Sequence, residues 1–525
     1  MFGRSRLAPL LLMLTYIMLA LIPLAAHAIT VRIDDGHVLN SIPAGFASFT
    51  LDFHPGSQGA VWGKNASILE VDLTNEALVG IASALAPGVL RLGGSEAGQN
   101  LTYVGFPGAD APCPSGYYYC LTRERWDEIL TFASTTGVRL MLDLNLIGPA
   151  QSDDWDAAAS QIDALLSYTA SKGVTPWAFE LGNENQGMLK PEEAAARFGR
   201  VHDSLARHWP DDSARPLLVG PSVHIQPDWI VSFLAALSPR RQLPLDVFAY
   251  HMYSGYGKAP DIAAQVPTTA FLDDARALVD VASSAVRWSQ AGPAASLPLM
   301  VSETAAAWAS GGPSGACVAF ASSFWYVDHL AHAAATPGGG HLAVARQTLI
   351  GGNYSLVDSN RGFTANPDYF VALLWRRVVE GGGGDGVVEQ DASAAAAGRV
   401  RVLRSGRPPV IAEDTHRELR SFAACDPSGR LVVALANLGT AAASVVVQLS
   451  SGPVVTEQRR DEWLLTGESD DLLTRQVRLN GELLTSSGGN VPPTPPRKSN
   501  STDPISAPPH SIAFVRFEQV PAACA

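Results

Sequence analysis

Basic side chains are scarce in this sequence. Its 525 residues include 37 Lys and Arg against 50 Asp and Glu, which gives a formal net charge of −13. An acidic surface repels nucleic acids and polysulfated polymers, so we expect neither as a broad binding partner. Charged residues make up 17% of the chain and hydrophobic residues 47%, a balance that excludes wholesale disorder.

Long apolar runs are also missing after the first 28 residues. There, Arg4 and Arg6 precede an apolar run over residues 7–24, and Ala26-His27-Ala28 has the small-x-small form of a cleavage site. Residues 1–28 therefore predict a signal peptide and a secreted protein, with the lysosome or vacuole as other destinations and an uncleaved anchor as the alternative. No stable membrane partner is expected. Four sequons, at Asn65, Asn100, Asn353 and Asn500, agree with secretion and are candidate glycosylation sites.

Cysteine is scarce as well, with five in the chain. This number fits an oxidising compartment with one thiol left over. Cys113 and Cys120 flank a short tyrosine-rich segment and could form a small bridge, and Cys425 and Cys524 could tie the chain end to a late strand. Cys317 would then be free, as a small buried hydrophobic residue. Spacing alone does not determine the connectivity.

What the sequence does contain is a repeated order of short apolar strand, polar tip and longer helical segment. Helical segments are expected at residues 157–171, 191–208 and 271–288. Eight strands follow this order, at residues 45–52, 89–92, 139–146, 177–181, 217–223, 247–253, 299–303 and 342–349. Eight strands alternating with helices predict an α/β fold, a (β/α)8 TIM barrel over residues 41–380.

The pattern changes after a helical run at residues 369–379. Gly381–Gly384 and the Ala-rich segment near Ala394 mark a boundary. Short β-branched strands then predict a C-terminal antiparallel β-sandwich over residues 381–525, with strands at 400–403, 431–435, 443–449 and 512–517. Residues 29–40 precede the barrel and can add a strand to this sandwich. Residues 486–509 are rich in Pro, Ser and Gly and predict a flexible surface insertion.

Two glutamates stand at strand tips. Glu184 follows the apolar strand at residues 177–181, and Glu303 ends the strand at 299–303. In a closed barrel the C-terminal strand ends meet on one face, so these carboxyl groups can converge. Glycoside hydrolysis needs such a pair, one group to protonate the leaving oxygen and one to attack the anomeric carbon. The spacing therefore predicts a glycosidase.

Several motifs carry a family resemblance. Phe179-Glu180-Leu181-Gly182-Asn183-Glu184 and Val301-Ser302-Glu303-Thr304 surround the two glutamates. Further motifs lie at residues 90–95, 251–253, 352–358 and 366–369. Through them, nearly the whole chain after the leader resembles heparanase and the heparanase-like β-glucuronidases. That family implies retaining glycosidases with a (β/α)8 barrel and a β-sandwich.

The resemblance also implies roles for individual residues. Glu184 would be the acid/base, Glu303 the nucleophile, and Asn183 a hydrogen-bond partner of the sugar 2-hydroxyl. The other substrate-binding positions that it implies are Asp52 and Ser95 for sugar hydroxyls, Gln347 and Tyr354 for the subsite and the uronate carboxylate, and Tyr253 near the acid/base. It also supports the Cys425–Cys524 disulfide. His251, at a strand tip, either positions Glu303 or satisfies a hydrogen bond in the core.

Three departures from the family pattern concern the substrate and the processing of the chain. The animal enzyme follows its nucleophile with glycines whose amides bind the uronate carboxylate, whereas this chain reads Trp308-Ala309-Ser310-Gly311-Gly312. No long excised linker stands before Trp126, so we expect a single unprocessed chain. Basic heparin-binding clusters are not evident, which disfavours an extended sulfated substrate.

Other motifs predict little chemistry. His329 and His332 have the spacing of a metal pair but no third ligand cluster, and Gly381–Gly384 lacks the context of a phosphate loop. Trp308, Trp325 and Tyr326 could stack on sugars, although as a group they fit barrel packing better, with Trp308 the exception.

The sequence thus predicts a retaining β-glucuronidase that acts on a glucuronic-acid-containing glycan or glycoside and needs no cofactor or metal. The alternatives are endo-cleavage of a glucuronic-acid polymer and, in another class, a non-catalytic carbohydrate-binding protein.

Overall fold

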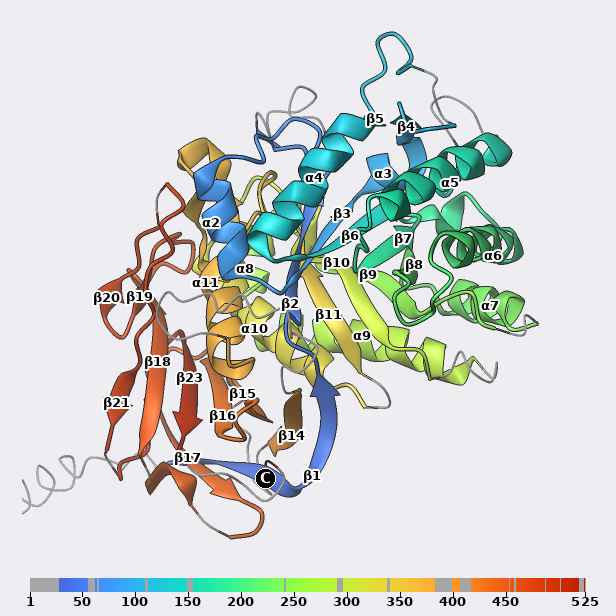
Figure 1. The fold of residues 1–525 in the computed structure, drawn as a ribbon. Coiled ribbons are helices and arrows are strands. Elements are labelled where there is room, and N and C mark those ends of the chain that lie inside the picture. Colours follow the sequence, from blue (N-terminus) through green and yellow to red (C-terminus); the bar gives the residue numbers. More distant parts are fainter. Residues whose placement is uncertain are drawn as a thin grey trace, which may run out of the picture.

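A computed structural model describes residues 28–54, 62–63, 66–108, 112–148, 154–239, 242–289, 296–337, 340–382, 399–406, 417–452, 454–457, 459–486, 488–500, 502–518 and 524. The predicted signal peptide up to His27, the sequon at Asn65 and the segment near Ala394 lie outside these residues. The described chain forms a barrel of parallel strands beside one large sheet (Figure 1).

All eight predicted barrel strands are present. They form a closed barrel in the order β10-β11-β2-β3-β6-β7-β8-β9, and each neighbouring pair is parallel. Their bounds are β2 Ala47–Asp52, β3 Val89–Gly93, β6 Arg139–Leu144, β7 Ala178–Leu181, β8 Leu217–His224, β9 Val247–Tyr256, β10 Leu299–Trp308 and β11 His341–Arg346. The predicted TIM barrel is confirmed.

The barrel strands are apolar on both faces. One set of side chains forms a buried cluster inside the barrel, made of Val89, Met141, Ala178, Val219, Val247, Ala249, Met300, Ala343 and Ala345. Their sequence neighbours, such as Leu90, Leu140 and Phe179, join the larger core shared with the helices. Parallel strands buried on both faces have near-continuous apolar sequences, which is why each strand is recognisable until it reaches its polar tip.

Helices surround the barrel, with α4, α5, α6, α7 and α9 along its outer side (Figure 1). Asn75, Thr122, Asp154 and Thr268 cap α2, α4, α5 and α9 by accepting hydrogen bonds from first-turn amides. The helices are α2 Glu76–Ala84, α3 Ser95–Asn100, α4 Arg123–Thr136, α5 Trp155–Ser171, α6 Pro191–His208, α7 Pro227–Leu237, α8 Ile262–Gln265, α9 Thr269–Trp288, α10 Phe320–Ala335 and α11 Pro367–Leu374. Short turns are η2 Asn185–Gly187, η4 Ala316–Val318, η5 Ser359–Arg361, the π-turn η6 Trp375–Val379, and η8 Val455–Glu457.

The second part of the fold is an eleven-stranded sheet in the order β20-β19-β18-β23-β16-β15-β14-β1-β17-β22, with β21 paired to β18. The strands are β1 Ile29–Ile42, β14 Val400–Gly406, β15 Leu419–Cys425, β16 Leu431–Asn437, β17 Ala443–Leu449, β18 Arg460–Gly467, β19 Val477–Leu479, β20 Glu482–Leu483, β21 Arg497–Ser499, β22 Ile505–Ala507 and β23 Ser511–Phe517. Among the described pairs of this sheet, only β1 with β17 is parallel. Two small pairs join β4 Thr102–Val104 to β5 Cys120–Thr122, and β12 Val357–Asp358 to β13 Thr364–Ala365.

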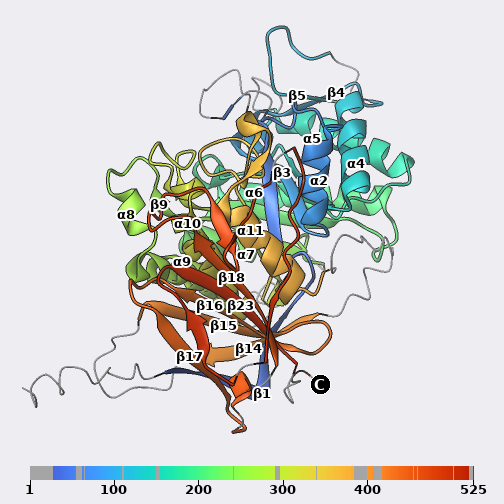
Figure 2. The same cartoon turned by 90° about the vertical axis from the view of Figure 1, so that its left-hand side faces the viewer.

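The first strand of the chain lies inside this sheet, between β14 and β17. The chain then runs from β1 directly into β2, and after α11 it returns to the sheet (Figures 1 and 2). The barrel segment is therefore attached to the sheet at both of its ends.

The sheet is buried on both faces at its centre. On β16, Val433 and Leu435 pack with Val31 of β1 and Val445 of β17. The alternate residue Ala434 faces the core that the sheet shares with the barrel helices. The sheet thus folds over a core of its own while its other face covers the barrel, which confirms the predicted β-sandwich.

The expectation of a flexible insertion at residues 486–509 is wrong. This stretch contains β21 and β22, which pair with β18 and β17. Proline lacks an amide hydrogen but keeps its carbonyl acceptor. The carbonyl of Pro492 accepts from Arg377, and that of Pro495 accepts from Asn480, so this Pro-rich composition still allows fixed contacts.

Both proposed disulfides are present. Cys113–Cys120 closes the loop before β5, and Cys425 at the end of β15 is joined to Cys524. Cys317 is free and fully buried. Burial raises the pKa of its thiol to about 11, as expected for an unreactive side chain.

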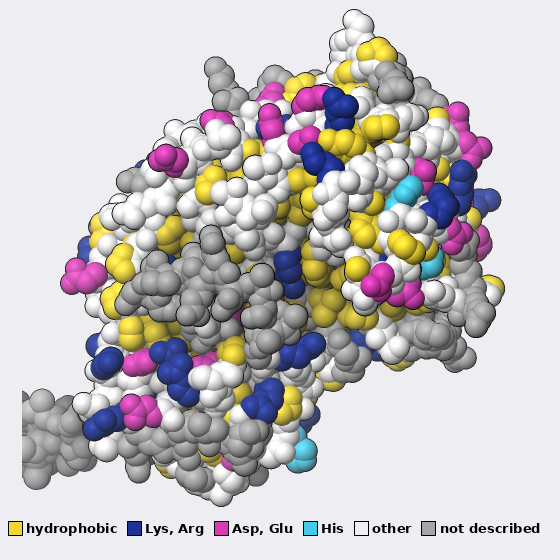
Figure 3. Space-filling model, viewed as in Figure 1, with side chains coloured by type: hydrophobic (Ala, Val, Ile, Leu, Met, Phe, Trp, Pro, Cys, Tyr) yellow, Lys and Arg dark blue, Asp and Glu magenta, His cyan; other side chains and the backbone are white. Residues whose placement is uncertain are grey.

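Charges of both signs mix on the face drawn in Figure 3, where Lys and Arg lie beside Asp and Glu. On the sheet, for example, Arg497 pairs with Glu462 and Arg516 with Asp461. Paired charges of this kind do not form an extended cationic surface. Of the helices in the described ranges, none has both the length and the hydropathy needed to cross a bilayer.

Phe422 tests the contact between the sheet and the barrel. Its buried ring on β15 lies 5.1 Å, centroid to centroid, from Trp375 of η6. Phe422→Ala should lower the free energy of unfolding by about 3–5 kcal/mol, because a cavity replaces the ring. Leu473→Ala, at an exposed position, is the control and should change little in urea or thermal unfolding. Equal midpoints for the two variants would contradict this packing.

Candidate active site

Arg91 of β3 organises the polar side chains at the C-terminal end of the barrel. Its guanidinium is fully buried and donates in three directions. Nε reaches Glu180 Oε2 at 2.5 Å, Nη1 reaches Glu303 Oε2 at 2.7 Å, and Nη2 reaches Asn183 Oδ1 at 2.7 Å. Burial acts to lower the pKa of Arg91, but Glu180 and Glu303 outweigh it and raise the pKa. A permanent buried cation therefore joins β3 to β7 and β10.

Glu303 lies on β10 and is nearly buried. Arg91 donates to its Oε2, and the Tyr253 hydroxyl on β9 donates to its Oε1. Burial, and then the negative charge of Glu303, raise the pKa of Tyr253 well above its usual value, so the hydroxyl keeps its proton. Tyr253 was expected near the acid/base; its hydroxyl binds Glu303, and the charge of Glu184 also contributes to its raised pKa. Both Glu303 oxygens are thus held by donors.

Glu184 lies three residues after the end of β7 and has a left-handed backbone with φ of 55°. Its Oε1 lies 2.8 Å from His251 Nδ1 of β9, and its Oε2 lies 3.2 Å from His224 Nε2 of β8. Burial raises the pKa of this carboxyl, but the hydrogen bonds with His224 and His251 outweigh burial, and the net pKa is lowered. His251 therefore contacts Glu184, not Glu303 as one sequence interpretation had it.

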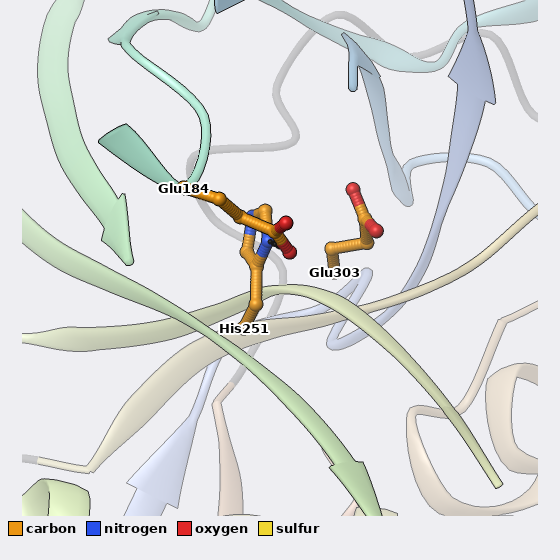
Figure 4. A group of neighbouring side chains, drawn as sticks. All are labelled: Glu184, His251 and Glu303. Carbon is orange, nitrogen blue, oxygen red and sulfur yellow. Dashed lines mark hydrogen bonds and ion pairs between the residues drawn. The ribbon is translucent and has the colours of Figure 1, made fainter. Parts of the chain in front are cut away.

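The two carboxyl groups lie close together. One oxygen of Glu184, one of Glu303 and a ring nitrogen of His251 lie within 4.8 Å of one another. Figure 4 shows these three side chains converging, with the Glu184 carboxyl group beside the His251 ring. A sugar between the two glutamates would have a carboxyl group on each side.

Asn183 is buried beside this pair. Its backbone amide donates to Asn185 Oδ1 at 2.8 Å, and its side-chain oxygen accepts from Arg91. An arginine N–H can pair only with the oxygen of the amide, so the Asn183 amino group is left to donate elsewhere. In this orientation the Asn183 amino group can donate a hydrogen bond to a sugar hydroxyl.

Asp52, Gln347 and Tyr354 form a second cluster, at the tips of β2 and β11. Gln347 Nε2 donates to Asp52 Oδ2 at 3.0 Å and lies 3.5 Å from the Tyr354 hydroxyl. Burial, followed by the charges of Glu96 and Glu303, raises the pKa of Asp52 well above its usual value. Burial, with Glu303 next, raises the pKa of Tyr354 in the same way. The structure thus brings together three of the predicted subsite residues.

Ser95 is exposed at the first position of α3. The preceding Gly94 has φ of 115°, and a Cβ there would lie 2.7 Å from Asp52 Oδ2. The glycine lets this turn approach Asp52, and Ser95 stands at the edge of the cluster formed by Asp52, Gln347 and Tyr354.

Most of the other residues singled out in the sequence pack in the core, and Trp308 does not. Trp325 and Tyr326 are buried, whereas Trp308 is 52% exposed. His329 is buried against Trp325, and burial lowers its pKa to about 3. His332 instead binds Asp280 at 2.8 Å, so the two histidines contact different partners and do not act as a metal pair.

Among the described residues, Glu184, His251 and Glu303 are the group with the spacing of metal ligands. Their facing atoms already interact with protein groups. Arg91 and Tyr253 donate to Glu303, while His224 and His251 contact Glu184. A cation at this point would have to displace these contacts.

Sequence reasoning missed three residues of the site. Arg91 and Glu180 stood within quoted motifs but received no chemical role, and His224 was not singled out. A buried arginine inside an apolar strand needs carboxylate partners, so Arg91 and Glu180 could have been paired from that signal. His224 ends a strand, as Glu303 was expected to do, and the same criterion would have found it.

Three sequons lie in the described chain. Asn100 and Asn500 are exposed. Asn353 uses its Nδ2, the atom that would carry a glycan, to donate to the Gly312 carbonyl at 2.9 Å. Glycosylation of Asn100, Asn353 and Asn500 stays a prediction, as does that of Asn65, which lies outside the described residues.

Parallel barrel enzymes place their chemistry at the C-terminal strand ends, and enzymes that cleave glycosidic bonds use two carboxyl groups there. Glu184 and Glu303 meet both conditions, which places the protein among the glycoside hydrolases.

A match to a family model narrows this class. Residues 28–331 match the N-terminal domain of glycosyl hydrolase family 79, and the chain belongs to this family. The resemblance drawn from the sequence motifs is confirmed.

Individual proteins support the assignment. The chain is 27% identical to heparanase-like protein 3 of Arabidopsis thaliana, covering 92% of this chain and 91% of that protein. It is 26% identical to baicalin-beta-D-glucuronidase of Scutellaria baicalensis, covering 89% and 88%. The fold is similar to that of a GH51 arabinofuranosidase from Xanthomonas axonopodis pv. citri, with a TM-score of 0.62, 15% identity, and 94% and 100% coverage.

Arg91→Lys tests the central contact. A lysine ammonium is a single point charge that cannot reach Glu180, Asn183 and Glu303 with the geometry of a guanidinium. We expect kcat on an aryl β-glucuronide to fall about 10²-fold, the scale of an active site misplaced by about 1 Å. Arg276→Lys, at an Arg–Asp pair between α9 and α10, is the control. Equal kcat values for both variants would contradict a central role of Arg91.

Gly98→Ala tests how α3 positions the segment that carries Glu184. A Cβ at Gly98 would overlap the Asn183 amide nitrogen and lie 2.6 Å from Asn183 Cβ. The backbone before Glu184 must then shift, so kcat should fall by roughly 10-fold to 10²-fold. Gly187→Ala, where a Cβ meets open space, should keep wild-type kcat. A Gly98→Ala enzyme with normal kcat would show that α3 does not position this segment.

Proposed function

We propose that this family 79 enzyme is a retaining β-glucuronidase that releases terminal β-linked glucuronic acid from glycans or glycosides. The observation that carries this proposal is the approach of Glu184 and Glu303 oxygens to within 4.8 Å. Retaining glycosidases hold their carboxyl groups about 5–5.5 Å apart, while inverting ones leave roughly 6.5–9.5 Å for a water molecule. The spacing therefore favours double displacement.

In the first step Glu303 attacks the anomeric carbon, the glycosidic C–O bond breaks, and the proton of Glu184 passes to the leaving oxygen. In the second step Glu184 takes a proton from water, which attacks the anomeric carbon and breaks the ester to Glu303. Arg91 and Tyr253 orient Glu303 for both steps. Asn183 supplies a donor for the sugar 2-hydroxyl.

The loop after β10 supports glucuronate as the sugar. Ala309, Ser310, Gly311 and Gly312 all have positive φ, between 55° and 75°. Successive amides in such a turn can form an anion-binding concavity. The amide of Asn353 donates to the Ser310 carbonyl at 2.9 Å, which places the loop beside Tyr354. These amides take the place of the glycine-run amides of the animal enzyme.

Asp52 fits the same substrate. Because burial and the neighbouring carboxylates raise its pKa, the neutral acid is favoured. A neutral Asp52 can bind a sugar hydroxyl without repelling the uronate.

A rim of side chains beyond Asp52 supports cleavage of terminal residues. His54 Nδ1 lies 2.8 Å from Glu96 Oε1, the His54 ring lies 5.2 Å from that of Trp62, and Trp62 meets Tyr354 at 5.9 Å. Glu184, just after β7, and His224, at the end of β8, lie across the barrel, where the leaving group must be protonated. The rim therefore limits the space available beyond the non-reducing end of the sugar.

Endo-cleavage of a glucuronic-acid polymer is the second candidate. Tyr256 and Trp308, at the ends of β9 and β10, are exposed and have ring centroids 4.4 Å apart. Exposed aromatic faces could bind further sugar units of a longer chain. We also propose that the protein is secreted, on the basis of its leader and sequons, which amino-terminal sequencing of the exported protein would check.

The catalytic assignment is tested with an aryl β-glucuronide. Glu303→Ala should lose turnover because no nucleophile remains. Glu184→Gln should lose about 10²–10⁴-fold, the usual contribution of a positioned acid. Proton NMR of the first-formed sugar should show retained β configuration. Equal turnover in wild type and both variants would contradict the catalytic roles of Glu184 and Glu303. A first product of inverted configuration would contradict the retaining mechanism.

The substrate is tested with a matched panel. The aryl β-glucuronide should be preferred over the aryl β-glucoside, which lacks the carboxylate. Unsulfated glucuronic-acid oligosaccharides should release a terminal monosaccharide. Internal fragments would favour endo-cleavage, and preference for the glucoside would contradict glucuronate recognition.

A further inference from the structure

His224 has no role in the mechanism above, yet it contacts the proposed acid. It is the last residue of β8, its Nε2 lies 3.2 Å from Glu184 Oε2, and half of its side chain is exposed. His251 contacts the other oxygen from a fully buried position. Glu184 therefore lies between an inner imidazole closed to solvent and an outer one open to it.

The two imidazoles create a problem for a general acid. Glu184 must hold a proton when substrate binds, but hydrogen bonds to its oxygens from both rings favour the carboxylate. The proton need not leave the site, because the Oε2–Nε2 contact can hold it on either atom. The other titratable groups around this pair are His251 and Tyr253 on β9 and Glu303 on β10.

We propose that His224 is a positioning residue that shares one proton with Glu184 at the Oε2–Nε2 contact and so keeps the acid supplied between turnovers. This inference rests on the proposed function. The proton returns from Nε2 to Oε2 and passes from there to the leaving oxygen. The proton that Glu184 later takes from water restores the pair, so each cycle is balanced.

The Glu184–His224 contact determines in which direction loss of His224 shifts the pH dependence of activity. The hydrogen bond to Glu184 raises the pKa of His224, so the pair keeps its shared proton as the pH rises until it passes that raised pKa. Without His224, only a carboxyl group holds the proton, and it ionises at lower pH. Ordinary values are about 6.5 for imidazole and about 4.3 for a Glu carboxyl.

His224→Gln keeps a donor beside Glu184 but cannot hold the proton. With phenyl β-glucuronide, whose poor leaving group needs acid, the basic limb of kcat/KM should move to lower pH by roughly 1–2 units. With 2,4-dinitrophenyl β-glucuronide, whose leaving group departs without a proton, the limb should stay at its wild-type position.

Two further variants complete the test. His208→Gln removes an imidazole that pairs with Asp163 at 3.0 Å, away from the site, and should leave both profiles unchanged. His224→Ala should show the shifted limb, and added imidazole should move it back.

The outcomes distinguish the role of His224 from the proposed β-glucuronidase function. A wild-type profile in His224→Gln with the phenyl substrate, or equal losses with both substrates at every pH, would overturn the role of His224. Glu184→Gln would remain inactive on the phenyl substrate in that case, which leaves the proposed function standing. A wild-type enzyme inactive on both glucuronides would overturn the proposed function itself.

Discussion

The contacts of one buried cation connect the fold to its chemistry. A charge removed from water costs several kcal/mol unless ion pairs and hydrogen bonds replace the lost solvation. Arg91 is fully buried and receives that compensation from Glu180, Asn183 and Glu303, which lie on or just after β7 and β10. These partners meet only when the barrel is closed in this register. The contacts that satisfy the cation are therefore the same contacts that place Glu303, the proposed nucleophile, and the side-chain amide of Asn183.

The acids near this cation differ in their contacts with it and in their surroundings. Glu180 and Glu303 contact the guanidinium directly, while burial and then the charge of Glu180 raise the pKa of Asp143 well above its usual value. Asp52 is likewise shifted upward by burial and by its acidic neighbours. Glu180 and Glu303 thus accept hydrogen bonds from the guanidinium, whereas the carboxyl groups of Asp52 and Asp143 have raised pKa values. Environments that separate otherwise similar carboxyl groups are a general feature of glycosidase sites.

Local signals made the barrel and both glutamates predictable. Each barrel strand is apolar on both faces and ends in a polar tip. The strands, and with them Glu184 and Glu303, could therefore be located without knowing which residues they contact in the fold. Arg91 could not be assigned in this way, because its three partners lie 89, 92 and 212 residues away. The parallel pairing of β1 with β17 depends on a contact still more distant in sequence, between Ile29 and Val445. The prediction of a flexible insertion at residues 486–509 was wrong for a related reason. Composition does not show which carbonyl groups of this segment will accept hydrogen bonds from Arg377 and Asn480.

The asymmetry around Glu184 explains why two histidines are needed where one would fix the carboxyl group. His251 is closed to solvent and contacts Oε1, so it can orient the group but has no exchange with water. His224 is half exposed and contacts Oε2. A retaining glycosidase requires its acid to be protonated in one step and ionised in the next. An inner contact that stays fixed, together with an outer one that exchanges protons, satisfies both requirements. A single buried imidazole would hold the carboxyl group in place without supplying the proton.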